Sequence, residues 1–127
     1  MSKKKHHIQA HQKELQLLGR QLSRRAKSCC ELCSQKSPLS VVEIPPTFDL
    51  PDVDRAILCC HSCQTLLETQ SSLARRDVFF LEEAIWSDIT PVQLAAIRLA
   101  MRCPEMQNTL DDLYIDEDIQ LLLNKDK

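Results

Sequence analysis

Apolar residues first recur at helical spacing between Gln9 and Ala26, near the start of the chain. Three leucines fall three and four positions apart and would share one face of a helix: Leu15, Leu18 and Leu22. Arginines fall largely on the other side, and Gly19 lowers the stability of such a helix by about 1 kcal/mol relative to alanine. The pattern predicts an amphipathic helix that docks on a core, preceded by a flexible basic tail over residues 1–8.

A different pattern follows in the next third of the chain. Leu39–Ile44 is rich in β-branched residues and is followed at once by Pro45 and Pro46, as the end of a strand would be. A loop with proline and aspartates, typical of turns, leads to the apolar run Ala56–Cys59. We expect these two runs to form a β-hairpin, followed by a helix from Gln64 to about Ser71 that Ser62 caps.

The C-terminal half contains further segments with helical periodicity. The first covers about Val78 to Trp86, and two short ones are expected at about 105–113 and 117–123. The clearest helix start is Thr90-Pro91-Val92-Gln93, where threonine would cap the helix, proline would take its first position and glutamine would cap in return. That helix is expected to run to about Arg102, so residues after 77 are predicted to be mostly helical.

Seven cysteines change this picture, because four of them form two C-x-x-C pairs. The pairs are Cys30 with Cys33 and Cys60 with Cys63, and the hairpin would fill the 26 residues between them. Four thiolates close a tetrahedral zinc site, and two intervening residues let both sulfurs of a pair reach one ion. We therefore expect these four cysteines to hold one structural Zn²⁺. The turn Cys30–Cys33, called the knuckle below, the hairpin and the helix would follow one another in the order of a treble clef or zinc ribbon.

The remaining cysteines are expected to lie outside the metal site. Cys29 with Cys33, and Cys59 with Cys63, would form C-x-x-x-C pairs, whose geometry is poorer for one metal ion. Strand alternation would also turn Cys59 away from the side of Cys60. Cys103 precedes a proline and is expected to pack as a small apolar side chain. The histidines are expected to be solvated or unneeded as ligands: His6, His7, His11 and His61.

Charge is distributed unevenly along the 127 residues. Residues 1–36 hold nine lysines and arginines against two glutamates, whereas residues 37–127 hold seven against sixteen acidic residues. The basic segment favours a nucleic-acid contact through six side chains: Lys3, Lys4, Lys5, Arg20, Arg24 and Arg25. The alternative is that the two oppositely charged halves attract each other or stay solvated.

No apolar segment suits secretion or membrane insertion. The chain opens with Met-Ser-Lys-Lys-Lys and has no run of about 18 apolar residues. Reduced, metal-binding thiols suit a reducing compartment better than a disulfide framework would. We expect a cytoplasmic protein without membrane contact.

No catalytic residues are predicted. A site closed by four cysteines leaves no open position for water or substrate. The chain has no serine–histidine–acid pattern and no glycine-rich phosphate loop. The acidic pairs Glu82–Glu83 and Asp111–Asp112 lie beside helix-pattern apolar residues, which is typical of solvated helix faces. The metal is therefore expected to hold the fold and to do no chemistry.

Taken together, these segments make the chain resemble the PhnA family of small bacterial proteins. The resemblance covers about residues 20–118 and lies in eight segments: Leu22–Ala26, Cys30–Cys33, Ser40–Pro45, Ile57–Leu58, Cys60–Cys63, Ala84–Ser87, Pro91–Gln93 and Leu113–Glu117. It implies a zinc-binding N-terminal region with Cys30, Cys33, Cys60 and Cys63 as ligands, and a link to alkylphosphonate utilisation. Members commonly carry a further small β-rich domain, which we expect this chain to lack after its last helical segment.

A second similarity is to HNH nucleases, which use a treble clef with two C-x-x-C pairs. Their first strand typically carries a histidine before an apolar residue and a proline, whereas this strand reads Val42-Glu43-Ile44-Pro45. The scaffold is similar and the catalytic histidine is missing. The similarity implies, as an alternative function, a catalytically inactive nucleic-acid-binding treble clef.

The sequence thus predicts a mostly helical α+β protein built on a small zinc module. The expected parts are the flexible tail over 1–8, a zinc-binding module with its N-terminal helix over 9–76, and a helical extension over 77–127 that packs on it. The expected function is that of a small PhnA-like zinc-binding protein that interacts with or regulates a protein partner.

Overall fold

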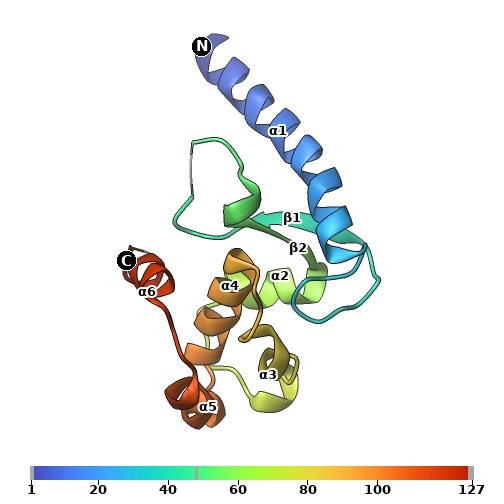
Figure 1. The fold of residues 1–127 in the computed structure, drawn as a ribbon. Helices are drawn as coiled ribbons and strands as arrows, with labels where there is room; N and C mark the ends of the chain where they lie inside the picture. The colour runs from blue at the N-terminus through green and yellow to red at the C-terminus, as the bar shows by residue number, and fades with distance from the viewer. Residues whose placement is uncertain (1, 48, 126–127) are drawn as a thin grey trace.

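Helices and strands follow the predicted order in the structure, a computed structural model that describes residues 2–47 and 49–125. The α-helices are α1 (Ser2–Ala26), α2 (His61–Glu68), α3 (Leu81–Ala84), α4 (Thr90–Met101), α5 (Gln107–Asp112) and α6 (Glu117–Lys125). The two strands are β1 (Leu39–Glu43) and β2 (Ala56–Cys60), which form one antiparallel sheet. The fold is therefore mostly helical with a small sheet, an α+β arrangement (Figure 1).

The hairpin is covered on both faces. Leu39 pairs with Cys60 and Glu43 with Ala56, so alternate side chains of the two strands share a face. One face presents Leu58 to α1, and the opposite face presents Ile57 to the core around α4. All five residues of β2 are buried, which explains why this strand reads as a continuous apolar run.

Helix α1 packs across the hairpin with its C-terminal half. Leu18 and Leu22 form a small core with Ala56 and Leu58, and the helix continues past the hairpin toward the N-terminus (Figure 1). The helix begins at Ser2, so residues 2–8, expected as part of a flexible tail, continue α1 instead. The sequence before Gly19 has no proline or glycine, and lysine and glutamine favour helix, so nothing local stops it.

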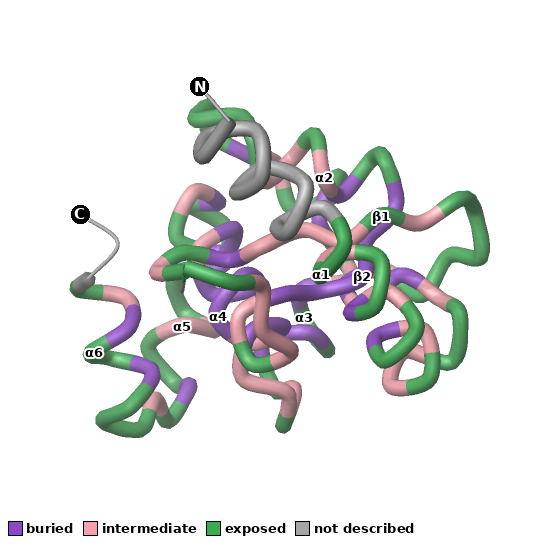
Figure 2. Tube along the Cα trace, turned by 90° about the horizontal axis from the view of Figure 1, so that it is seen from above, coloured by how far each residue is buried: buried purple, intermediate pink, exposed green. Residues whose placement is uncertain are grey.

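The main core surrounds α4. Eight of the twelve residues of α4 are buried, and buried positions concentrate along α4 and β2 (Figure 2). The same apolar cluster extends from Cys30 near the N-terminal knuckle to Leu122 in α6. Both cysteine pairs and the C-terminal helices therefore share one core. Among the described residues, no helix combines the length and apolarity needed to cross a membrane.

Three details differ from the predicted helices. Helix α2 begins at His61 with Cys60 as its cap residue, so Ser62 lies inside the first turn and does not cap it. Helix α4 has Ile89 at its cap position, and the Gln93 side chain donates to the carbonyl of Ile85 at 2.9 Å, so the expected reciprocal cap with Thr90 is wrong. The reason is local: the Ser87 hydroxyl accepts from the Ile89 N–H at 3.1 Å and starts the turn earlier.

The segment expected as a helix over 78–86 is mostly turns. Only Leu81–Ala84 is α-helical, after a short 3₁₀ turn at Arg75–Asp77. Val78, Leu81 and Ile85 are nevertheless fully buried, so their helical spacing correctly indicated one buried face. Burial of these side chains against α4 shapes the segment more than helix propensity does.

Candidate metal centre

The two C-x-x-C pairs meet where the hairpin ends. Cys30 and Cys33 lie in the knuckle after α1, Cys60 is the last residue of β2, and Cys63 lies in the first turn of α2. Their four sulfur atoms all lie within 4.8 Å of one another, and the sulfurs of Cys33 and Cys60 are 3.6 Å apart. Sulfurs of a tetrahedral zinc site, each about 2.3 Å from the ion, would be about 3.8 Å apart. The group therefore has the ligand number and the size of a metal site.

Backbone hydrogen bonds shape the knuckle around Cys30. The Cys30 N–H donates to the Gln35 carbonyl and the Ser34 N–H donates to the Cys30 carbonyl, each at 2.9 Å. The Cys33 N–H lies 3.5 Å from the Cys30 sulfur, toward which it donates. Ser34 adopts a positive φ of 67°, the left-handed conformation that a tight turn requires and that non-glycine residues seldom adopt. The turn thus directs two sulfurs to the same side.

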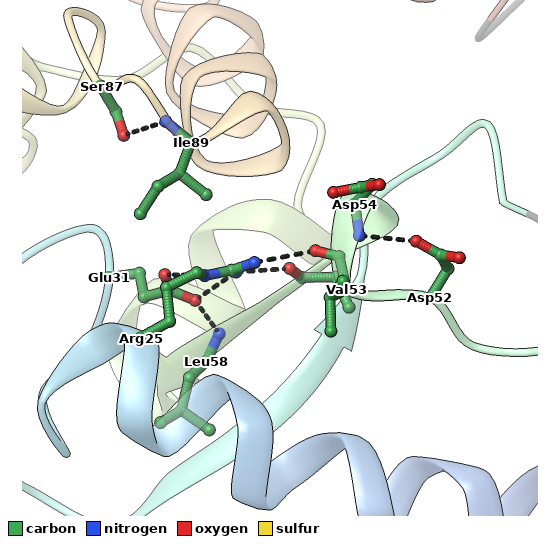
Figure 3. Close-up of polar contacts among 9 residues, drawn as sticks. Arg25, Glu31, Asp52, Val53, Asp54, Leu58, Ser87 and Ile89 are labelled. Carbon is green, nitrogen blue, oxygen red and sulfur yellow. Dashed lines mark hydrogen bonds and ion pairs between the residues drawn. The ribbon is translucent and has the colours of Figure 1, made fainter.

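Glu31, which lies between Cys30 and Cys33, links the knuckle to β2. Its N–H donates to the Leu58 carbonyl and its carboxylate accepts from the Leu58 N–H, both at 2.8 Å. Arg25 at the end of α1 donates to both carboxylate oxygens of Glu31 at 2.8 Å (Figure 3). The Glu31 side chain is 3% exposed, so this pair is largely shielded from water and joins α1, the knuckle and β2.

This role of Arg25 corrects one sequence prediction. Its guanidinium also donates to the carbonyls of Val53 at 2.8 Å and Ala56 at 2.9 Å, so its donors are engaged inside the protein and not offered to nucleic acid. Arg20 and Arg24 are exposed, whereas the side chains of Lys3, Lys4 and Lys5 lie outside the described residues. Sequence reasoning counted Glu31 only as a charge and missed its structural role; the available signal was a lone acidic residue between Cys30 and Cys33.

The sulfurs are shielded from solvent and hydrogen-bonded to one another. Cys30, Cys60 and Cys63 are buried and Cys33 is partly buried. Hydrogen bonds from the Cys59 and Cys63 thiols lower the pKa of Cys30, and the hydrogen bond with Cys30 raises the pKa of Cys63. Burial raises the pKa of Cys33 to about 11. Crowded thiols of this kind share protons, which a bound cation would replace.

Cys59 lies nearer to the site than strand alternation suggested. It is fully buried, its thiol donates to the Cys60 carbonyl at 3.4 Å, and a hydrogen bond with Cys30 raises its pKa. The chain passes from β2 into α2 directly after Cys60. Cys59 is nevertheless outside the group of four.

The other candidates lie elsewhere. Cys103 is buried in the main core, as expected of a small apolar side chain. Cys29 is partly exposed and donates to the Lys27 carbonyl at 3.5 Å. His61 is exposed, and the side chains of the three N-terminal histidines lie outside the described residues.

The chain was compared with family models, curated proteins and solved structures. None of them matches it. The site itself therefore carries the functional argument. Among the residues whose side chains the structure describes, the four cysteines are the only group of three or more ligand-type residues close enough to hold a metal.

Proposed function

We propose that Cys30, Cys33, Cys60 and Cys63 hold one structural Zn²⁺ in a treble-clef arrangement. The observation that carries this proposal is the mutual approach of four sulfurs within 4.8 Å, each from one of two C-x-x-C pairs. Thiolate is the ligand that zinc prefers in closed structural sites, and four of them leave no position for water or substrate. Bound zinc would supply cross-linking between the knuckle and the β2–α2 junction.

We propose that the protein is a PhnA-like, non-enzymatic protein of the reducing cytoplasm and that it binds a protein partner. Exposed aromatic side chains near α3 support the interaction role, because Phe79 is 71% exposed and Trp86 is 54% exposed. Aromatic residues are enriched where proteins bind one another. The family assignment rests on the sequence segments alone, and the link to alkylphosphonate utilisation rests on the family assignment.

Elemental analysis of the purified full chain tests the metal proposal. We expect one zinc per chain in the wild type and in Cys29→Ser, whose sulfur lies outside the group of four. Cys33→Ser and Cys63→Ser should lose most of the zinc, because three thiolates bind it far more weakly than four. Unchanged zinc content in Cys63→Ser, or wild-type protein without zinc after purification under reducing conditions, would overturn the proposal.

Photo-crosslinking in cells tests the interaction role. A photoreactive residue in place of Phe79 should yield protein adducts, and the same residue in place of the exposed Glu105 serves as the control. Adducts with nucleic acid alone would contradict the role and support the nucleic-acid-binding alternative.

A further inference from the structure

A groove runs between α1 and β1. It has a volume of about 730 Å³ and is lined from α1 by Leu15, Gly19, Arg20 and Arg24, and from β1 by Leu39 and Val41. Apolar side chains form its inner wall, and the two exposed arginines stand one helical turn apart at its rim. The groove thus combines an apolar wall with fixed positive charge.

The strand in this groove has one edge without a strand neighbour. In the described part of the chain, β2 is the only strand that neighbours β1. The Leu58 N–H and carbonyl point away from β1, because both bond to Glu31. Val41 lies opposite Leu58, so in an antiparallel pair its N–H and carbonyl point away from β2 as well. The backbone of Val41 is therefore directed to the outer edge of β1.

Gly19 lies in the lining of this groove, although the fold does not require glycine there. A Cβ added at Gly19 would lie 3.6 Å from the Val41 Cγ2, an ordinary contact, and no glycine of the chain has a positive φ. Glycine inside a helix is less stable than alanine by about 1 kcal/mol. The only glycine of the chain thus lies where a larger side chain would reduce the space between helix and strand.

We propose that this groove binds an extended acidic peptide segment of a partner protein, which adds to β1 as a third strand. This inference deepens the proposed interaction role and rests on it. Side chains two residues apart in a strand are about 6.7 Å apart on one face, close to the spacing of Arg20 and Arg24 on α1. Acidic residues at alternate peptide positions would therefore meet both guanidinium groups, while the peptide backbone bonds to the edge of β1.

The lining favours a peptide over nucleic acid. The described lining holds no carboxylate that would repel an acidic ligand, and it holds no aromatic side chain on which a base would stack. Arg25, the third arginine in this part of α1, is engaged with Glu31 and with the carbonyls of Val53 and Ala56. A strand edge with apolar side chains is a surface for a polypeptide backbone.

The test selects random twelve-residue peptides, displayed on phage, against the zinc-loaded full chain. Enriched peptides should alternate acidic with β-branched residues. Binding of the synthesised peptides should fall roughly tenfold or more in Arg20→Glu/Arg24→Glu, because two charge-assisted contacts become repulsive. Lys27→Glu, which changes an exposed charge outside the groove, should have little effect. Gly19→Leu fills the groove without changing charge and should also abolish binding.

Two measurements separate the outcomes. N-methylation of alternate peptide amides should abolish binding, since it removes the donors that pair with β1. Zinc content and circular dichroism of every variant show whether a loss of binding reflects unfolding. Retained zinc with no enriched peptide, or with peptides that bind Arg20→Glu/Arg24→Glu and Gly19→Leu as well as the wild type, overturns the groove inference and leaves the metal proposal intact.

Other occupants would also be recognised. A labelled 20-nucleotide single strand that binds in place of peptides, with affinity that falls steeply with salt and is lost in the double variant, would reassign the groove to nucleic acid. Self-association that the double variant abolishes would reassign it to the acidic segment 111–118 of a second copy. Either result overturns the peptide proposal.

Discussion

Helix α4 buries eight of its twelve residues, whereas α1, with 25 residues, buries Leu18 and Leu22 among the side chains that the structure describes from Lys13 on. The two helices are consequently held by different forces. Helix α4 is surrounded by apolar side chains, while α1 depends on a narrow stripe and on the Arg25–Glu31 pair. The N-terminal part therefore relies on specific links, one ion pair and one proposed metal, and the C-terminal part on buried area.

Removal of zinc by a chelator should produce the largest difference in stability between the two regions. Structural zinc contributes roughly 10 kcal/mol or more of apparent binding energy, comparable with the stability of a whole domain. Under a strong chelator, we expect hydrogen exchange to rise first in the knuckle, β2 and α2, and last in α4, since α4 retains apolar neighbours. Simultaneous exchange of all segments would mean that the two regions form one cooperative unit.

Truncation of a core side chain in α4 should cause the second-largest loss of stability. Leu94→Ala removes a fully buried side chain and is expected to lower the free energy of unfolding by about 2–5 kcal/mol in urea titrations. Leu121→Ala in α6, at an exposed leucine, is the matched control and should cost well under 1 kcal/mol. Equal effects of the two substitutions would contradict the description of the main core.

The ion pair should have an intermediate effect. Glu31→Ala leaves the Leu58 N–H without its carboxylate acceptor and Arg25 without its charge partner, so we expect a loss of about 2–3 kcal/mol. Glu31→Gln keeps an acceptor for Leu58 and should cost less. Thermal denaturation with zinc present measures both. If Glu31→Ala melted like the wild type, the pair would not be what fastens the knuckle to β2.

The smallest effect is expected at Gly19. Gly19→Ala should raise the free energy of unfolding by up to about 1 kcal/mol, because a Cβ fits there and alanine is the better helix former. Urea denaturation monitored at the α-helical signal measures it. A destabilised Gly19→Ala would show that the space beside Val41 is smaller than the structure describes.

The same contrast explains what could be predicted from the sequence. The first strand was predictable because it is rich in β-branched residues and Pro45-Pro46 follows it, and the second because it is a continuous apolar run. The mutual approach of the four sulfurs follows the C-x-x-C spacing. The apolar spacing of Val78, Leu81 and Ile85 also correctly indicated buried side chains, although the segment that contains them is mostly turns. Local patterns therefore sufficed wherever one segment determined its own geometry.

Apart from the approach of the two cysteine pairs, contacts between distant segments were not predictable. Arg25 counted as one of several basic side chains of the first helix, and only the fold brings it within 2.8 Å of Glu31. Strand alternation turned Cys59 away from the site, yet its thiol shares a hydrogen bond with Cys30. Many alternative partners exist for one arginine in a sequence with eighteen acidic residues, so tertiary packing decides.

The two hydrogen bonds between Glu31 and Leu58 also determine how the hairpin can meet other chains. They occupy the outer edge of β2, so the knuckle protects that edge and leaves β1 as the side on which a strand can add. A sheet with one available edge can accept a single added strand and then stops. A hairpin that lost its knuckle would have two available edges, which is the geometry of open-ended aggregation. We therefore expect the knuckle to hinder strand addition at the outer edge of β2.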